Sequence, residues 1–353
     1  MAIDEAPPFW WKKPRLRAWL LSPLGTVYGR AAAARMALTP SASVEVPVIC
    51  VGNFILGGAG KTPTVAMIAE YLIRQKINPG ILSRGYGGAI TNPTLVDLKH
   101  HNSRDVGDEA LLHARVATTV VAHDRAAGAR LLVEHGCKII LMDDGMQNPT
   151  LRKDYNLAVI DSNRGIGNGY CIPAGPMRVP LNDQLTHIDA ALLIGEGDEG
   201  TKTIRKVARA GKPVFQAFIE AKDSRWLKGK KVIAFAGIGD PEKFYQTLRE
   251  QGCEIEVEQN FGDHHMFTED ECVDLINLGR EKKLDLITTE KDYVRLLGMG
   301  VAQEKLAEVT KTLPITLVPD DPATLDRIIQ AAISRGETRL LAEEKANRRE
   351  QIR

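Results

Sequence analysis

The stretch "VICVGNFILGGAGKTPT", residues 48–64, runs from an apolar segment through the glycine-rich turn "GGAGKT" into a helical pattern. Gly57, Gly58 and Gly60 have no Cβ, so the backbone can wrap closely around an anion there. A helix N-terminus attracts negative charge, and Lys61 and Thr62 add an ammonium group and a hydroxyl at that end. A strand, a glycine loop and a helix in this order predict a phosphate-binding loop.

One position departs from the usual pattern G-x-x-x-x-G-K-[ST], because Ile55 stands where the first glycine is expected. Position 55 forms the entrance of the loop rather than the part that touches phosphate. We therefore predict nucleotide binding by Ile55, Leu56, Gly57, Gly58, Ala59, Gly60, Lys61 and Thr62. Lys61 would reach the β- and γ-phosphates, and Thr62 would hold Mg²⁺. The alternative is an ordinary strand-to-helix turn that contains G-K-T by chance.

A magnesium site beside such a loop needs a carboxylate at the end of a neighbouring strand. The segment "KIILMDDG", residues 138–145, ends an apolar run in Asp143 and Asp144. We predict that Thr62, Asp143 and Asp144 form the metal group, with Asp143 the better partner through a water molecule. Asp144 either binds the metal or helps to position an attacking group.

The rest of the chain repeats the alternation of short apolar runs, glycine- or aspartate-rich turns and helical patterns. The runs are apolar on both faces, as strands of a parallel sheet covered by helices must be. The alternation predicts an α/β fold with a doubly wound, mostly parallel sheet of the P-loop NTPase type. The runs, with the turns that end them, lie at 46–53, 79–88, 118–123, 137–145, 157–163 and 190–197.

A polar and charged segment, residues 220–231, interrupts this alternation, which then restarts. The restart predicts a second, smaller α/β domain. We expect four parts: an N-terminal arm or helix at 1–36, a P-loop core at 37–225, the smaller domain at 226–335 and a charged tail at 336–353.

The composition is that of an ordinary globular protein, with 353 residues, 44% hydrophobic and 26% charged. A formal net charge of +1 argues against a nucleic-acid-coating protein. Five widely spaced cysteines without a C-x-x-C pair favour a reducing compartment over a zinc or disulfide framework. No apolar window reaches the roughly 18 residues of a membrane span. The sequence shows no sign of an obligate protein partner.

The N-terminal segment 9–19 sets aromatic rings beside cations, a combination suited to a bilayer interface. Ser22 is expected to cap a new helix with Pro23 in its first turn. The alternative is an arm that packs on the protein's own core, and the pattern leaves both open. The residues concerned are Phe9, Trp10, Trp11, Lys12, Lys13, Arg15, Arg17 and Trp19, followed by Leu24, Val27, Tyr28 and Ala31 on one helical face.

Three other segments carry polar side chains near expected helix starts. Asp105, Asp108 and Glu109 in "DVGDEALL" are most simply helix caps. His264 and His265 precede a capping signature and so lie in a loop. The charges of "ITTEKDYVRL", residues 287–296, either cap a helix or face a cleft between domains, and the stiff loop 170–180 presents Arg178 to a phosphate or merely connects two elements.

Taken in order, these motifs resemble the tetraacyldisaccharide 4′-kinases of lipid A biosynthesis over about residues 15–330. The motifs are "VGNFILGGAGKTPT", "ILSRGYGG", "GDEALL", "DDGMQN", "PAGPMR", "FGDHHMFT" and "TTEKD". The resemblance implies transfer of the ATP γ-phosphate to the 4′-hydroxyl of a tetraacylated glucosamine disaccharide 1-phosphate, which forms lipid IVA. It also implies a peripheral enzyme at the cytoplasmic face of a Gram-negative inner membrane. In this family the first position of the glycine loop is likewise not glycine.

The resemblance also implies catalytic roles. Asp108 becomes the base rather than a cap, His264 its partner, and Lys61 the third catalytic residue. Candidates for substrate or phosphate contacts are Arg84, Tyr86, Gln147 and Arg178.

The chain departs from the family pattern in two places. Val179 follows Arg178 where the family commonly has Glu, which puts an acidic role there in doubt. Met146 and Asn148 replace the usual Phe and His. A lipid substrate also favours the interfacial interpretation of the N-terminal arm.

Two other functions are alternatives to kinase activity. A deviant P-loop ATPase that acts as a switch or partitioning module carries a lysine before the glycines, where this chain has Leu56. A binding protein that uses nucleotide only for structure is the second rival.

Overall fold

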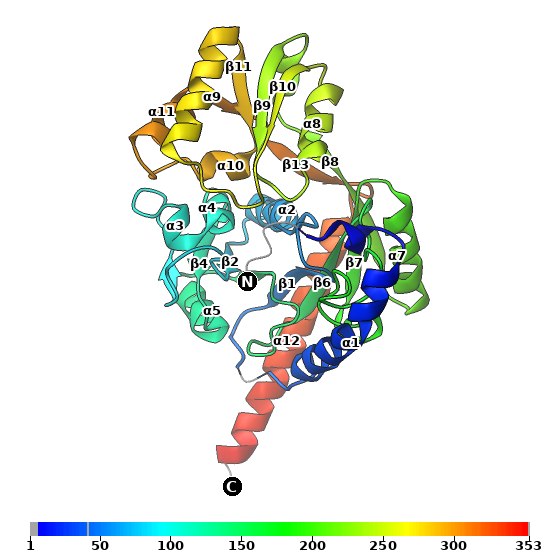
Figure 1. The fold of residues 1–353 in the computed structure, drawn as a ribbon. Helices are drawn as coiled ribbons and strands as arrows, with labels where there is room; N and C mark the ends of the chain where they lie inside the picture. Colours follow the sequence, from blue (N-terminus) through cyan, green and yellow to red (C-terminus); the bar gives the residue numbers. More distant parts are fainter. Residues whose placement is uncertain (1–5, 41, 352–353) are drawn as a thin grey trace.

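The computed structural model describes residues 6–40 and 42–351, which contain a nine-stranded and a four-stranded sheet (Figure 1). The larger sheet has the order β13-β8-β7-β6-β1-β5-β2-β4-β3. Neighbouring strands are parallel except at its two edges, where β13 pairs antiparallel with β8 and β3 with β4. The strands are β1 (Val48–Asn53), β2 (Pro79–Ser83), β3 (Thr94–Leu95), β4 (Thr118–Val121), β5 (Ile139–Asp143), β6 (Tyr155–Asp161), β7 (Ala190–Ile194), β8 (Val214–Ala221) and β13 (Ile315–Pro319).

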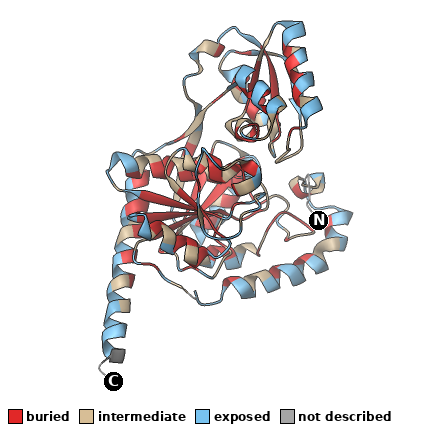
Figure 2. Cartoon of the chain, turned by 90° about the vertical axis from the view of Figure 1, so that its left-hand side faces the viewer, coloured by how far each residue is buried: buried red, intermediate tan, exposed pale blue. Residues whose placement is uncertain are grey.

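Helices cover both faces of this sheet, which explains why its strands are apolar on both sides. Along β1, Val48 and Cys50 belong to one buried cluster, while Ile49 and Val51 belong to another on the opposite face. The second cluster includes side chains from α2 (Lys61–Arg74) and α12 (Thr324–Gln351). In Figure 2 the strands form a buried layer between helices whose outer sides are exposed. The other helices of this domain are α1 (Leu16–Met36), α3 (Ser103–Val106), α4 (Asp108–Ala114), α5 (Arg125–Glu134), α6 (Leu181–His187) and α7 (Asp198–Arg209), with a 3₁₀ turn at Pro8–Trp11.

The smaller domain is a parallel four-stranded sheet with the order β10-β9-β11-β12. Buried clusters lie on both of its faces, one including Phe244 and Leu248 of α8 and the other Leu275 of α9 and Leu306 of α11. Its elements are β9 (Lys231–Ala236), α8 (Pro241–Glu250), β10 (Glu254–Asn260), α9 (Glu269–Lys282), β11 (Asp285–Thr288), α10 (Glu290–Val294), α11 (Val301–Val309) and β12 (Thr310–Thr312), preceded by a 3₁₀ turn at Ser224–Leu227. The predicted fold class, a doubly wound sheet with a smaller α/β domain, is confirmed.

The expected domain ends are wrong, because the chain returns to the larger domain before residue 335. Strand β13 adds to the edge of the nine-stranded sheet beside β8, and α12 packs Leu325, Ile328 and Ile329 against that sheet. The segment expected as a charged tail continues α12 to Gln351. Local periodicity identifies a strand and a helix but does not say which sheet they join.

Within α12, Arg339 is buried and anchors the helix to the core. Its Nε donates to Asp154 Oδ1 at 2.8 Å, and its Nη1 donates to the carbonyl of Val44 at 3.0 Å. Asp154 in turn accepts the Val48 N–H at the start of β1, at 2.9 Å. This ion pair therefore ties the last helix to the strand that leads into the glycine loop.

The N-terminal helix α1 is continuous, so the helix start expected at Ser22 is wrong. Pro23 lies inside the helix and has no N–H for the carbonyl of Trp19, but the Ser22 hydroxyl donates to that carbonyl at 2.8 Å. This local bond replaces the one that proline removes.

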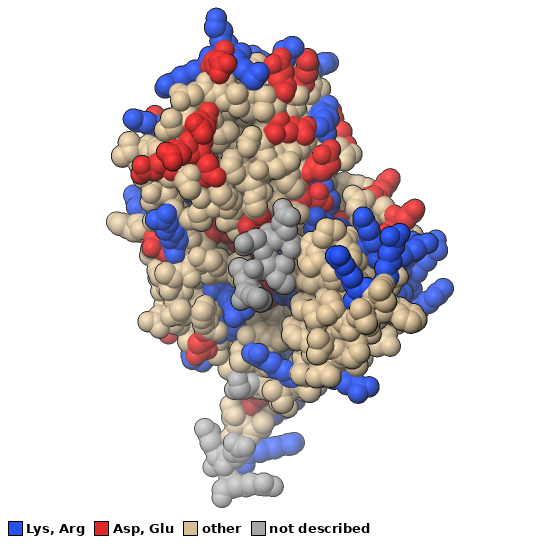
Figure 3. Space-filling view, in the orientation of Figure 1, with Lys and Arg blue, Asp and Glu red and all other residues tan. Residues whose placement is uncertain are grey.

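The two faces of α1 differ in character. Small residues face the protein: a Cβ on Gly25 would lie 2.7 Å from the Cys171 carbonyl oxygen. The opposite side exposes large apolar side chains, and Figure 3 shows a mostly uncharged surface over α1 with lysine and arginine side chains at its edges. No helix in residues 6–40 and 42–351 combines the length and the hydropathy needed to cross a bilayer. The exposed apolar residues are Leu16, Trp19, Leu20, Leu24, Val27 and Tyr28.

Arg339→Gln is expected to lower the free energy of unfolding by about 3 kcal/mol or more, because it leaves the buried Asp154 carboxylate without a cation. Urea denaturation followed by circular dichroism measures the change. Arg348→Gln, which removes an exposed cation paired with Glu344 on the same helix, is the matched control. It is expected to cost less than about 1 kcal/mol. Equal losses in the two variants would contradict the anchoring role of Arg339.

Candidate active site

The glycine loop leaves the end of β1 and enters α2 at Lys61. Gly57 and Gly60 have φ values of 104° and 86°, which side chains rarely tolerate. A Cβ on Gly60 would lie 2.4 Å from the Ile194 side chain, whereas one on Gly58 would meet nothing within 4 Å. The loop is therefore closely packed at Gly60 and leaves open space at Gly58, as a phosphate-binding loop requires.

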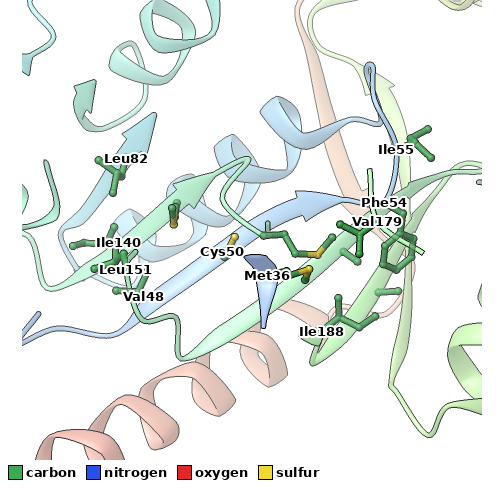
Figure 4. Close-up of a cluster of buried hydrophobic side chains, with 14 of the residues drawn as sticks. Met36, Val48, Cys50, Phe54, Ile55, Leu82, Ile140, Leu151, Val179 and Ile188 are labelled. Carbon is green, nitrogen blue, oxygen red and sulfur yellow. The ribbon is translucent and has the colours of Figure 1, made fainter. Parts of the chain in front are cut away.

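The structure explains why residue 55 is not glycine. Ile55 is buried in the core cluster, where Figure 4 labels it together with Phe54 and Val179. It also forms an antiparallel bridge with Met177, and the next N–H, that of Leu56, donates to the Pro176 carbonyl at 2.7 Å. The loop entrance is thus fixed by the Pro/Gly loop 170–180, and an apolar side chain stabilises it better than glycine.

Asp144 is the carboxylate that faces Lys61, at 3.9 Å between Oδ2 and Nζ. Arg178 binds Asp144 through two bonds, Nη1 to Oδ1 at 2.7 Å and Nη2 to Oδ2 at 2.9 Å, and its Nε donates to the Ile55 carbonyl at 3.0 Å. Burial alone would raise the pKa of Asp144, but the charges of Arg178 and Lys61 hold it well below its usual range. Arg178 therefore links the loop entrance to an ionised carboxylate, and Gln147 supports it by accepting at 3.3 Å.

Asp143, the last residue of β5, is directed toward the protein interior. Its Oδ2 lies 2.9 Å from Nε2 of the buried His113. Its Oδ1 is also buried and has no hydrogen-bond partner within residues 6–40 and 42–351. An orphaned buried carboxylate oxygen near the loop fits a cation or a water molecule that a cation holds.

The oxygen-rich donor set also suits Mg²⁺. The Thr62 hydroxyl donates to Glu109 Oε1 at 3.4 Å, so a further carboxylate adjoins the expected metal group. Among the described residues, no cluster of three or more His, Cys, Asp or Glu side chains forms a ready-made metal site. Mg²⁺ commonly binds through few protein oxygens together with waters and phosphates, so Thr62, Asp143 and Asp144 fit that ion.

Asp108 and His264 come from different domains and meet. His264 Nδ1 lies 3.0 Å from Asp108 Oδ2, and the Tyr86 ring contacts the imidazole edge-on with centroids 5.4 Å apart. The N-cap of α4 is Gly107, and the N-cap of α3 is Asn102, whose capping box Asp105 completes from the N3 position. Asp108 is therefore not the cap that its position suggested.

Three further residues complete this group. The sequence placed Glu109 among the helix caps and left open whether the charges of residues 287–296, which include Lys291 and Arg295, cap a helix or face a cleft between domains. Arg295 Nε donates to Asp108 Oδ2 at 2.7 Å, and Lys291 Nζ donates to Glu109 Oε1 at 2.8 Å. Burial works against the charge of Asp108, but the positive charge of Lys291, the hydrogen bond from His264 and the charge of Arg295 hold its pKa far below the usual value. The same competition, led by Lys291 and Lys61, lowers the pKa of Glu109 to about 2.

The remaining expected residues occupy different positions. His265 pairs with Glu271 of α9 at 2.9 Å and belongs to the helix cap, so only His264 of the two faces Asp108. Gln147 donates to the Asn53 carbonyl at 3.0 Å and supports the loop from below. Arg84 is exposed just after β2. Val179 is fully buried in the apolar core, and as a valine it supplies no acidic group at that position.

The parallel pairing of β1 with β5 sets Val51, just before the loop, opposite Asp143. A glycine loop after one strand and carboxylates at the end of its neighbour define a nucleotide-binding protein of the P-loop class. More specifically, the chain belongs to the tetraacyldisaccharide-1-P 4′-kinase family, whose profile matches residues 17–334.

Individual relatives agree with this assignment. The chain is 49% identical to a tetraacyldisaccharide 4′-kinase of Rhizobium meliloti (strain 1021) over 345 residues, covering 98% of this chain and 99% of that protein. It is 46% identical to the enzyme of the same name from Chelativorans sp. (strain BNC1) over 341 residues, covering 97% and 99%. The crystal structure of LpxK from Aquifex aeolicus in complex with ATP superposes with a TM-score of 0.68 at 26% identity, covering 90% of this chain and all of that one. The family expected from the motifs is confirmed, and the ATPase switch receives no support.

Proposed function

We propose that this protein is an ATP-dependent kinase that transfers the γ-phosphate to the 4′-hydroxyl of a tetraacylated glucosamine disaccharide 1-phosphate, which forms lipid IVA. One observation carries the proposal. Glu109, which adjoins Thr62 of the glycine loop, follows directly after Asp108 of the Asp108–His264 pair. A proton acceptor and a phosphate cradle therefore share one site, as transfer from a nucleotide to an alcohol requires.

The residues of the chain divide the work of this reaction. The loop N–H groups and Lys61 hold the β- and γ-phosphates, and their positive charge offsets the charge that spreads over the transferred group. Arg178 keeps Asp144 ionised and ties the loop entrance in place. When bound, Mg²⁺ held by Thr62, Asp143 and Asp144 would neutralise further phosphate charge.

Asp108 is the proposed base for the acceptor hydroxyl. Its Oδ2 accepts hydrogen bonds from His264 and Arg295. Within the described residues, its Oδ1 accepts only the N–H of Glu109, at 2.8 Å. Oδ1 thus retains a lone pair for the hydroxyl proton. Because the transition state of phosphoryl transfer is loose, the proton can leave late, so a weakly basic carboxylate suffices. As the acceptor oxygen bonds to the γ-phosphorus, the bond between the γ-phosphorus and the bridging β-phosphate oxygen breaks. Asp108 takes the proton of the acceptor hydroxyl.

The apolar side of α1 fits a lipid acceptor. Moving acyl chains into water costs about 0.8 kcal/mol per CH₂, so the enzyme gains by reaching the sugar at the bilayer surface. Exposed Leu20 and Leu24 on α1, with Lys12, Lys13 and Arg17 nearby in the chain, suit an anionic bilayer interface. We infer peripheral attachment to the cytoplasmic face of the inner membrane, with no nucleic-acid partner and no obligate protein partner.

The direct test is an assay with radiolabelled ATP and the purified disaccharide lipid, comparing the wild type with Lys61→Ala. The wild type is expected to label the lipid once, at the 4′ position. Lys61→Ala is expected to lose about 10³-fold or more in kcat/KM, because a loop without its ammonium group cannot neutralise the transferred phosphate. ATP hydrolysis by the wild type without lipid labelling, or near-normal turnover by Lys61→Ala, would contradict the proposal.

Asp108→Asn is expected to lower kcat by about 10²- to 10⁴-fold while the KM for ATP changes little, because it removes the proton acceptor and not a nucleotide contact. Steady-state kinetics at saturating lipid measure both constants. Asp105→Asn, which alters the N3 carboxylate of the α3 capping box, is the matched control and should keep kcat. If Asp108→Asn instead unfolds the protein and the folded fraction turns over normally, Asp108 has only a structural role.

Replacing Leu20 and Leu24 together by Glu is expected to weaken binding to anionic phospholipid vesicles by at least about tenfold, because each leucine gains about 1.5 kcal/mol or more from burial. Vesicle sedimentation measures the partition coefficient. Leu341→Glu changes another exposed leucine, on α12, and serves as the control. These point variants are preferable to deletion of residues 1–20, which would remove the buried Trp10. Unchanged partitioning of the double variant would exclude docking through α1.

A further inference from the structure

We propose that Arg295 is a positioning residue for phosphoryl transfer, because it fixes both members of the Asp108–His264 pair at once. The inference rests on the proposed kinase function and adds a residue to it. Arg295 follows α10 in the smaller domain, and its side chain is only 1% exposed.

The guanidinium group of Arg295 reaches three acceptors. Its Nε donates to Asp108 Oδ2 at 2.7 Å, and Nη2 lies 2.5 Å from the same oxygen as part of the ion pair rather than as a hydrogen bond. Its Nη1 donates to the Gly237 carbonyl at 2.6 Å and to Asp292 Oδ1 at 2.7 Å. A planar group with donors in fixed directions holds these acceptors in one arrangement, which a single ammonium group cannot do. Arg295 thereby fixes the orientation of the Asp108 carboxylate and also stabilises its negative charge.

The Gly237 carbonyl extends this control to His264. It also accepts the backbone N–H of His264, at 3.1 Å. His264 has a φ of 60°, a backbone conformation that non-glycine residues keep only where their surroundings enforce it. Arg295 therefore binds the Asp108 carboxylate through Nε. Through Nη1 it binds the Gly237 carbonyl, which also accepts the backbone N–H of His264.

Arg295 is itself held on both sides, which a positioning role requires. Asp292 is fully buried, and its Oδ2 accepts the Thr289 hydroxyl at 2.6 Å. Val294 packs into a cluster of the larger domain that includes Val106 and Leu111, on either side of Asp108 in the chain. The side chain is thus preorganised before any substrate arrives.

A second arginine bridges the domains elsewhere and provides a control. Arg164 Nη2 donates to the Gly239 carbonyl at 2.7 Å and lies 3.3 Å from Asp240, at the start of α8. Its guanidinium also stacks over the Trp11 ring. Within residues 6–40 and 42–351, Arg164 forms no hydrogen bond or ion pair with Asp108 or His264, so its loss tests domain contact alone.

The test compares Arg295→Ala, Arg295→Lys and Arg164→Ala with the wild type in the labelled-lipid assay, with and without about 10 mM guanidinium chloride. We expect Arg295→Ala to lose at least about 100-fold in kcat with the KM for ATP within about threefold, and guanidinium to restore at least about tenfold. Equal sodium chloride should restore nothing. Guanidinium does not stabilise proteins, so a variant whose only defect was stability would not recover.

Arg295→Lys keeps the positive charge and guards against failure of the alanine variant to fold. It is expected to unfold at a temperature near that of the wild type but to turn over at least about tenfold more slowly, since one ammonium group cannot bridge Asp108 and Gly237. Near-normal kcat in Arg295→Lys, rescue by sodium chloride as good as by guanidinium, or an equal loss in Arg164→Ala would overturn the positioning role. An inactive wild type in the same assay would instead overturn the proposed function.

Discussion

The arrangement of the whole molecule depends on one buried negative charge at the boundary between its domains. Asp108 belongs to the larger domain, yet Arg295, His264 and Lys291, which neutralise it, all belong to the smaller one. A buried carboxylate without such partners is costly, so the larger domain alone cannot keep Asp108 both ionised and out of water. Docking of the smaller domain meets this requirement and, in the same step, brings His264 to the site. The constraint that holds the domains together is therefore also the one that assembles the proposed catalytic pair.

The topology supports this arrangement from both ends of the smaller domain. The chain leaves the large sheet after β8 and returns to it as β13, which pairs with β8 itself. The smaller domain is thus an insertion with two connections side by side, rather than a domain hung on a single linker. Two adjacent connections restrict the motion of the smaller domain relative to the larger one more than a single linker would. The anchor of α12 through Arg339 and Asp154 holds the returning segment in place.

Much of the fold was predictable because it depends on local patterns. The glycine loop, the two-sided apolar strands and the restart after residue 231 identify the class and the second domain. The return of β13 and α12 was not predictable, since a strand's periodicity carries no record of which sheet edge it joins. At the site, Lys61, Asp143 and Asp144 were predictable from the sequence. Lys61 follows a glycine-rich turn, and the two aspartates stand at the end of an apolar run. Arg295 was not singled out, because 187 residues separate it from Asp108 and the charges of its own segment, 287–296, fit a helix cap as well as a cleft between domains. The sequence likewise predicted Glu109 to be a helix cap, whereas in the structure it accepts hydrogen bonds from Thr62 and Lys291.

The central claim is that the imidazole of the smaller domain is hydrogen-bonded to the carboxylate of the larger one in the free enzyme. Nuclear magnetic resonance of protein labelled with ¹⁵N at histidine tests it most directly, with the His264 signals assigned by their absence in His264→Gln. The account predicts a ring Nδ1–H of His264 that is shifted downfield, protected from exchange with water and lost when Asp108 is replaced by Ala. A His264 ring N–H that exchanges freely with water, or that is unchanged when Asp108 is replaced, would contradict it.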